Sequence, residues 1–166
     1  CASLYMVSST RLRPSSRYIV TRLPRLRISV INPASEATCG RISLGSAADV
    51  DAAVAAALRA FPTYASSSRQ ERIELLAAIL ATFARRHDDV ATAIMEEMGA
   101  PWTLATEDQA ASGPQHIKAA IKALRNFRFE EQLGTTQVIK EPVGPCALIT
   151  PWNWPINQIA LKVAPA

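Results

Sequence analysis

Asn153 has the setting in this sequence that most suggests chemistry. It lies between Trp152 and Trp154 in the segment 150–154, directly after the short apolar run 146–149. If that run is a strand of an open α/β sheet, the segment lies at its carboxyl end, where such sheets bind ligands. An amide N–H that the indoles keep dry can stabilise a developing oxyanion by roughly 3 to 4 kcal/mol. Asparagine is also common in turns and caps, so a purely structural role is the alternative.

Lys162 follows on the next predicted helix, either as a charge partner in a site or as an ordinary solvated lysine. The cysteines Cys1, Cys39 and Cys146 are far apart and the two histidines form no local pair, which favours neither a disulfide framework nor a zinc site. We expect Cys39, in an early turn, and Cys146, on a buried strand, to be structural thiols. The six glycines include no G-x-G pair and no P-loop, so the common phosphate-binding loops are absent.

Capping boxes predict the starts of two helices. In this motif a hydroxyl at the N-cap and an acid three residues later exchange hydrogen bonds with the backbone. Ser46 with Asp49 opens an Ala-rich helix that we expect to end before Pro62. Ser68 with Glu71 opens a second helix. This second helix carries an apolar stripe at helical spacing, typical of a packed face: Ile73, Leu76, Ile79, Leu80 and Phe83.

Two more helical segments complete a predicted helical layer. One starts at Asp88 and runs to Met98, where Gly99 is a typical C-terminal stop. The other spans about 103–128, with a break or kink expected at Gly113-Pro114.

Strand-like segments flank this layer. Residues 31–34 read as an extended segment that enters a turn, residues 38–44 as a short strand, and residues 135–139 as a strand of β-formers. The wholly apolar run 146–149 fits a strand buried on both faces, as in a parallel sheet. Pro155 then opens a helix. We therefore predict an α/β fold: an N-terminal helical layer plus the first strand, loop and helix of an incomplete Rossmann-like cofactor domain.

The composition describes a globular chain with a basic start. Its 166 residues are 49% apolar and 19% charged, and no uncharged stretch approaches the roughly 20 apolar residues of a membrane-spanning helix. Residues 1–35 hold six arginines and no acid, whereas residues 36–166 hold 12 basic side chains and all 14 acids. The net charge of +4 therefore comes from one segment, which weakens the case for a basic nucleic-acid-binding face.

Residues 1–29 are expected to form an atypical basic leader, because Pro14 and Pro24 would interrupt a helix. Three interpretations stay open: a disordered or artefactual leader, an organelle-targeting peptide rich in Arg and Ser, and an arm that contacts phosphates. Residues 30–166 are the expected domain. We expect the protein to be cytoplasmic, with organelle targeting as the alternative.

The chain from about residue 30 to 166 resembles the NAD(P)-dependent aldehyde dehydrogenase superfamily. The run EPVGPCALITPWNWP at 141–155, continuing as INQIALKVAPA, is highly specific for the start of that family's cofactor domain, and INPASE, DVDAAVAAALRAF and EEMGAP precede it in the family's order. The resemblance implies that Asn153 is a catalytic side-chain oxyanion donor and that Lys162 matches a lysine near the active site. It also implies that the NAD or NADP cleft is lined by Ile149, Thr150, Pro151 and Trp152.

The resemblance implies an enzyme that oxidises an aldehyde to a carboxylic acid through a thiohemiacetal and hydride transfer to NAD(P)+. The family's cysteine nucleophile and glutamate base come later in its chains, and neither Cys39 nor Cys146 matches that nucleophile. We therefore expect an N-terminal fragment that is inactive alone. Its complete enzyme would take an aldehyde substrate and form a homo-oligomer, with no nucleic acid or membrane as partner. The rival interpretation is a non-catalytic helical interaction module or gene remnant, which binds a full-length relative through the strand at 135–141.

Overall fold

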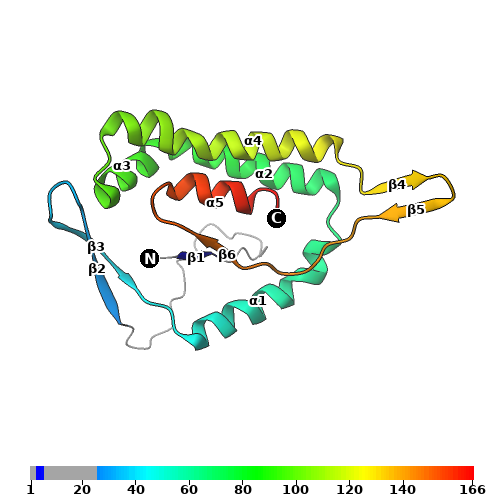
Figure 1. Ribbon diagram of the computed structural model, residues 1–166, viewed down its shortest axis with the longest axis horizontal. Coiled ribbons are helices and arrows are strands. Elements are labelled where there is room, and N and C mark those ends of the chain that lie inside the picture. Colours follow the sequence, from blue (N-terminus) through cyan, green and yellow to red (C-terminus); the bar gives the residue numbers. More distant parts are fainter. Residues whose placement is uncertain (1–2, 6–25) are drawn as a thin grey trace.

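The structure, a computed structural model, describes residues 3–5 and 26–166. In this part of the chain, helices are accompanied by three two-stranded antiparallel sheets (Figure 1). The elements are β1 Ser3–Tyr5, β2 Arg27–Ile31, β3 Thr38–Ser43, α1 Ala47–Ala65, α2 Arg69–Arg85, α3 His87–Met98, η1 Leu104–Ala110, α4 Ala111–Asn126, β4 Glu130–Leu133, β5 Thr136–Ile139, β6 Leu148–Thr150 and α5 Pro155–Val163. The layer of α2, α4 and α5 carries the segment that holds Asn153, and the hairpins β2–β3 and β4–β5 extend from the two ends of the molecule. The predicted helix-rich α/β arrangement is confirmed.

The start of α1 is the predicted capping box. Ser46 Oγ accepts from the N–H of Asp49 at 3.3 Å, and the Asp49 carboxylate accepts from the N–H of Ser46 at 2.8 Å. The predicted end before Pro62 is wrong, because α1 continues through the proline to Ala65. Proline removes one backbone donor from the helix, and this loss falls close to the C-terminus.

Arg72, on α2, holds the last turn of α1 in place. Its guanidinium donates to the carbonyls of Tyr64 and Ala65, at 3.5 and 3.1 Å, and to Ser67 Oγ at 2.9 Å. The final carbonyls of a helix have no partner within the helix, so these bonds satisfy groups that would otherwise depend on water. We infer that α1 continues past Pro62 because Arg72, on the next helix, donates hydrogen bonds to its last carbonyls.

α2 begins at the second predicted capping box, where the N–H of Ser68 donates to the Glu71 carboxylate at 2.7 Å. Its apolar stripe is only partly packed, since Leu76 is buried while Ile79 is exposed. The buried part joins the facing sides of α4 and α5 in one cluster. The buried members of this cluster are Leu76, Ile117, Ile121 and Ala160.

Gly99 ends α3 as predicted. It adopts a left-handed conformation with φ of 66°, and its N–H donates to the carbonyl of Met95 at 3.0 Å. A side chain there would also collide with the turn after β2, because an added Cβ would lie 2.8 Å from the backbone nitrogen of Ala34. Gly99 is therefore required both by its backbone conformation and by a close approach between two segments.

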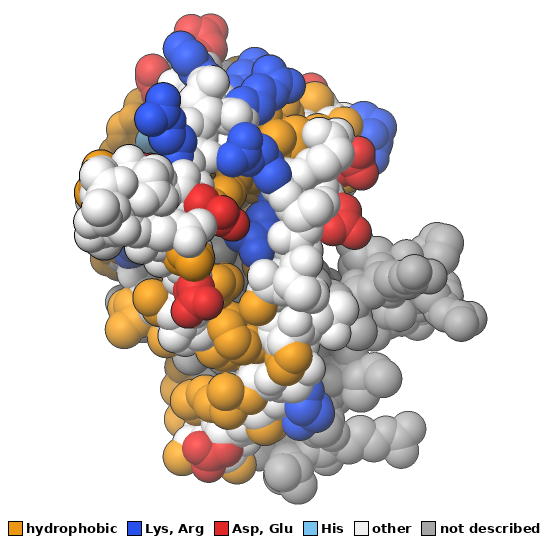
Figure 2. Space-filling model, turned by 90° about the vertical axis from the view of Figure 1, so that its right-hand side faces the viewer, with side chains coloured by type: hydrophobic (Ala, Val, Ile, Leu, Met, Phe, Trp, Pro, Cys, Tyr) orange, Lys and Arg blue, Asp and Glu red, His pale blue; other side chains and the backbone are white. Residues whose placement is uncertain are grey.

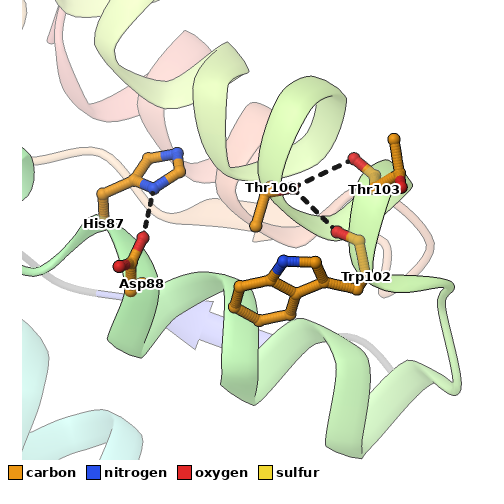
Figure 3. A network of polar contacts seen from close by, with 5 residues as sticks. All are labelled: His87, Asp88, Trp102, Thr103 and Thr106. Carbon is orange, nitrogen blue, oxygen red and sulfur yellow. Dashed lines mark hydrogen bonds and ion pairs between the residues drawn. The ribbon is translucent and has the colours of Figure 1, made fainter.

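The helix after Pro101 is continuous, so of the break or kink predicted at Gly113-Pro114 the break is wrong. Its irregular part comes earlier, as the π-helical turns of η1, which end at Ala110. In a regular α-helix the carbonyl of Ala110 would accept from residue 114, where proline has no N–H. At the start of η1 the Thr106 hydroxyl donates to the carbonyls of Trp102 and Thr103, across from the His87–Asp88 pair of α3 (Figure 3).

The β4–β5 hairpin projects from the end of the molecule that carries the C-terminus of α4 (Figure 1). β5 agrees with the predicted strand, whereas β4 was not predicted. Lys140 closes the base of the hairpin by donating to the Glu131 carboxylate, which lowers the pKa of Glu131. The face at this end gathers Lys and Arg side chains in its upper part and hydrophobic side chains below them (Figure 2).

The prediction of a strand at 146–149 buried in a parallel sheet is wrong in its start, its pairing and its burial. β6 starts only at Leu148, and its partner β1 runs antiparallel to it. Ile149 is 63% exposed, so one face of β6 is open. The apolar run reflects a strand that can be covered on both sides, but the described residues cover only one.

The predicted basic leader also needs correction at its boundary. β1, and residues 27–29 in β2, lie within the range 1–29 and are strands. Most of the segment on which the disordered-leader, targeting and phosphate-arm interpretations rest, residues 1–2 and 6–25, lies outside the described residues. Along the described ranges, no helix is both long and apolar enough to cross a membrane.

Candidate functional site

The loop from Thr150 to Trp154 joins β6 to α5 and carries Asn153. Thr150 is buried at the end of β6, with 4% of its surface exposed, and anchors the loop. Asn153 and Trp152 are exposed, the latter by 65%. Pro155 is the first residue of α5, as predicted, and its fixed φ suits that position. The loop therefore offers an amide and an indole to solvent between two anchored ends.

Lys162 closes this loop from the other side. Its Nζ donates to the carbonyl of Ile149, two residues into β6. The side chain runs back from the last turn of α5, so the ammonium lies at the carboxyl end of the strand. Lys162, which by resemblance matches a lysine near the active site, is thus in direct contact with Ile149, which by resemblance lines the cofactor cleft.

α5 is fastened to α4 by a hydrogen bond that the sequence did not reveal. His116 Nε2 and Asn157 Oδ1 lie 2.6 Å apart in a partly buried position. Beside this bond, Gly113 packs so closely on α5 that an added Cβ would lie 3.1 Å from Ile156 Cγ1. From the sequence alone, the two histidines suggest only possible metal ligands. In the described part of the chain, no three His, Cys, Asp or Glu side chains cluster to hold a metal ion.

Both described cysteines are exposed, so the prediction that Cys146 lies on a buried strand is wrong. Cys146 precedes β6 instead of lying on it, and its Sγ is 3.6 Å from the carbonyl of Gly144. Cys39 lies in β3, with its Sγ 3.4 Å from the carbonyl of Val30. A backbone carbonyl cannot remove a proton from a thiol, so neither contact creates an activated nucleophile.

The exposed groups of this loop suit part of a dinucleotide site. Trp152 and Ile149 present apolar surface against which flat rings can pack. Asn153 adds a neutral hydrogen-bond donor, and Lys162 adds a positive charge at the strand end. The arrangement can therefore bind a ring system beside an oxygen that gains negative charge, whereas it contains no nucleophile or general base of its own.

Comparisons of the sequence and of the structure with known proteins agree on one family. The model of the aldehyde dehydrogenase family matches residues 21–166. A 3-succinoylsemialdehyde-pyridine dehydrogenase from Pseudomonas sp is 54% identical over 138 residues, which are 82% of this chain and 29% of that protein. The chain thus spans less than a third of this relative.

Two solved structures show where this part lies in a complete fold. Aldehyde dehydrogenase from Bartonella henselae is 38% identical with a TM-score of 0.74, over 84% of this chain and 30% of that one. A mutant of aldehyde dehydrogenase C from Pseudomonas syringae, solved with NAD+ and octanal, is 36% identical with a TM-score of 0.78, over 84% and 29%. Because the family model covers most of the sequence and the fold agrees with these structures, the chain belongs to the aldehyde dehydrogenase family.

Proposed function

We propose that this chain is the N-terminal part of an enzyme that oxidises an aldehyde to a carboxylic acid with NAD+ or NADP+. The observation that carries the proposal is the loop between β6 and α5, which exposes Asn153 beside Trp152 and is tied through Lys162 to Ile149. Family membership supports the class of reaction. The chemistry of the loop supports the role of each residue.

Asn153 acts on the aldehyde oxygen in this proposal. The overall reaction converts an aldehyde, water and NAD(P)+ into a carboxylate, NAD(P)H and two protons. When a nucleophile adds to the aldehyde carbon, the oxygen gains negative charge, and the Asn153 amide N–H donates to it. A neutral donor stabilises this charge without transferring a proton, so the oxygen can regain its double bond when hydride leaves the carbon.

Four residues of the strand end and loop hold the cofactor: Ile149, Thr150, Pro151 and Trp152. When bound, the nicotinamide supplies the acceptor for hydride. Exposed Ile149 and Trp152 provide apolar surface for the dinucleotide, while buried Thr150 keeps the strand end in place. Lys162 fixes the backbone through the Ile149 carbonyl and leaves its positive charge at the cleft.

The 166-residue chain by itself is expected to be inactive. Covalent aldehyde oxidation needs a thiolate activated beside the bound carbonyl. The exposed thiols of Cys39 and Cys146 lie against backbone carbonyls, which cannot act as bases. We therefore expect the nucleophile to come from residues other than those described. We further propose that the complete enzyme is a cytoplasmic homo-oligomer.

A second candidate function is supported by the β4–β5 hairpin. Leu133 and Ile139 on this projecting hairpin are both largely exposed, which leaves apolar side chains at a strand edge. A non-catalytic module could use this hairpin to bind a full-length relative. Co-elution of the chain with such a relative, lost on Ile139→Lys but not on Lys118→Glu, would favour this function.

The enzyme proposal is tested by completing the chain. We would join it to the remaining segment of a close homologue and measure aldehyde-dependent reduction of NAD+ and NADP+. The joined protein should turn over, while the chain alone should form no NAD(P)H. Turnover by the chain alone, abolished by Cys39→Ser or Cys146→Ser, would contradict the assignment.

A further inference from the structure

Three contacts in a row join α4 to α5. At one level Gly113 lies against Ile156, at the next His116 bonds to Asn157, and beyond them Ile117 packs in the core cluster with α5. The packing contacts are apolar and have no preferred direction, so they hold α5 against α4 without fixing its rotation. The hydrogen bond is the directional member of this set.

The His116–Asn157 bond also defines which ring atom carries a proton. An amide oxygen can only accept, so His116 Nε2 donates to Asn157 Oδ1 across the 2.6 Å separation. The two residues are 41 positions apart and belong to different helices. Their partial burial reduces competition from water, so this hydrogen bond is stronger than one on the open surface.

The bond lies one helical turn from the loop that holds Asn153. The N–H of Gln158 donates to the carbonyl of Trp154 at 3.0 Å, so the end of the loop and the first turn of α5 are one hydrogen-bonded unit. At its other end the loop is fixed by Lys162 on the Ile149 carbonyl. A rotation of α5 about its axis would therefore be transmitted to the loop from both ends.

We propose that His116 is a positioning residue that sets the rotation of α5 and thereby the direction of the Asn153 amide. This inference rests on the proposed function of Asn153 as the oxyanion donor. His116 does not itself touch the substrate or cofactor in this account. It acts through Asn157 and the first turn of α5.

The test uses the 166-residue chain and needs no catalytic activity. Trp102 is replaced by Phe, which leaves Trp152 and Trp154, the residues on either side of Asn153, as the tryptophans of the chain. The positions of their indole N–H signals in 15N-edited NMR spectra report the loop conformation. His116→Leu removes the donor, His116→Gln keeps an N–H at similar reach, and Ile121→Val is a control in the core of the same helix.

His116→Leu should shift both indole signals, and His116→Gln should restore them. Ile121→Val should leave them in place even though it lowers the melting temperature. The proposal is overturned if His116→Leu folds with unchanged indole signals, or if Ile121→Val shifts them as much. If His116→Leu does not fold, Asn157→Asp and Asn157→Leu serve instead. The indole signals should stay in place in Asn157→Asp, which retains the acceptor, and should shift in Asn157→Leu. Equal spectra for the two variants would contradict the proposal.

A failure here leaves the kinetic test of Asn153 unaffected, so the two hypotheses are separable.

Discussion

Lys162 donates a hydrogen bond to the carbonyl of Ile149, so the last turn of α5 is tied to the strand that precedes the Asn153 loop. This hydrogen bond links the end of α5 back to β6, so that the strand, the loop and the helix form one closed unit. It fixes the loop from the side opposite to the His116–Asn157 bond.

Lys162→Met should remove this hydrogen bond while keeping the apolar stem of the side chain. Loss of one hydrogen bond is expected to lower the free energy of unfolding by about 1 kcal/mol. Urea denaturation measures this change. Lys118→Met, at an exposed position of α4, is the matched control and should have little effect. Equal stability losses for the two variants would show that the Ile149 contact is not stabilising.

Gly99→Ala should be more destabilising than the same change at Gly134. Both glycines have a positive φ, 66° and 62°, so each alanine bears the left-handed cost of about 1 to 2 kcal/mol. At Gly99 the added Cβ also meets the backbone of Ala34 at 2.8 Å, whereas the space around Gly134 is open. The difference between the two unfolding free energies isolates this close approach. A Gly134→Ala loss as large as that of Gly99→Ala would contradict the packing described here.

Glu71 should make the chain less stable in acid. The backbone N–H of Ser68 and then its hydroxyl hold the pKa of Glu71 below its usual value. A carboxyl with a lowered folded pKa stabilises fully above its unfolded pKa, and this stability is lost as the pH falls through the folded pKa. The loss in urea midpoint between neutral and acidic pH should therefore be smaller in Glu71→Gln. The exposed Glu74→Gln variant is the control; an identical acid loss in both variants and the parent would count against the capping role.

The exposed surface of the site should make the isolated chain associate. Ile149 and Trp152 both expose most of their surface, at 63% and 65%, and unpaired apolar edges favour association. The chain is expected to bind a hydrophobic dye and to elute as more than a monomer. Ile149→Ser should reduce both signals, unlike Leu26→Ser, which removes an exposed leucine elsewhere. A monodisperse parent chain with a sharp melt would argue against this surface being adhesive.

The sequence predicted those parts of the fold that depend on neighbouring residues. Ser46 with Asp49 and Ser68 with Glu71 are local motifs, and both open helices as expected. The predicted end of α1 was wrong because Arg72, which lies beyond the helix, satisfies the final carbonyls of α1. This contact depends on how two helices meet, which periodicity does not report.

The site was predicted less completely for the same reason. The exposure of Ile149 depends on which strands cover β6, and composition alone indicates only that it can be buried. The His116–Asn157 contact joins residues 41 positions apart, and no local pattern marks it. β4 was missed because its residues Glu130 to Gln132 are polar and show no alternation, and its pairing with β5 gives it its structure.

The most direct test of the account is the kinetics of Asn153→Ala in the chain completed with the remainder of a close homologue. If the amide stabilises the developing oxyanion, kcat should fall by about 100- to 1000-fold, while cofactor affinity and melting temperature stay nearly unchanged. Asn126→Ala, at an exposed asparagine on α4, should leave all three quantities unaltered. If Asn153 only supports the turn, the variant should lose about 1 kcal/mol of stability and little activity. A normal kcat with a lowered melting temperature would contradict the oxyanion role.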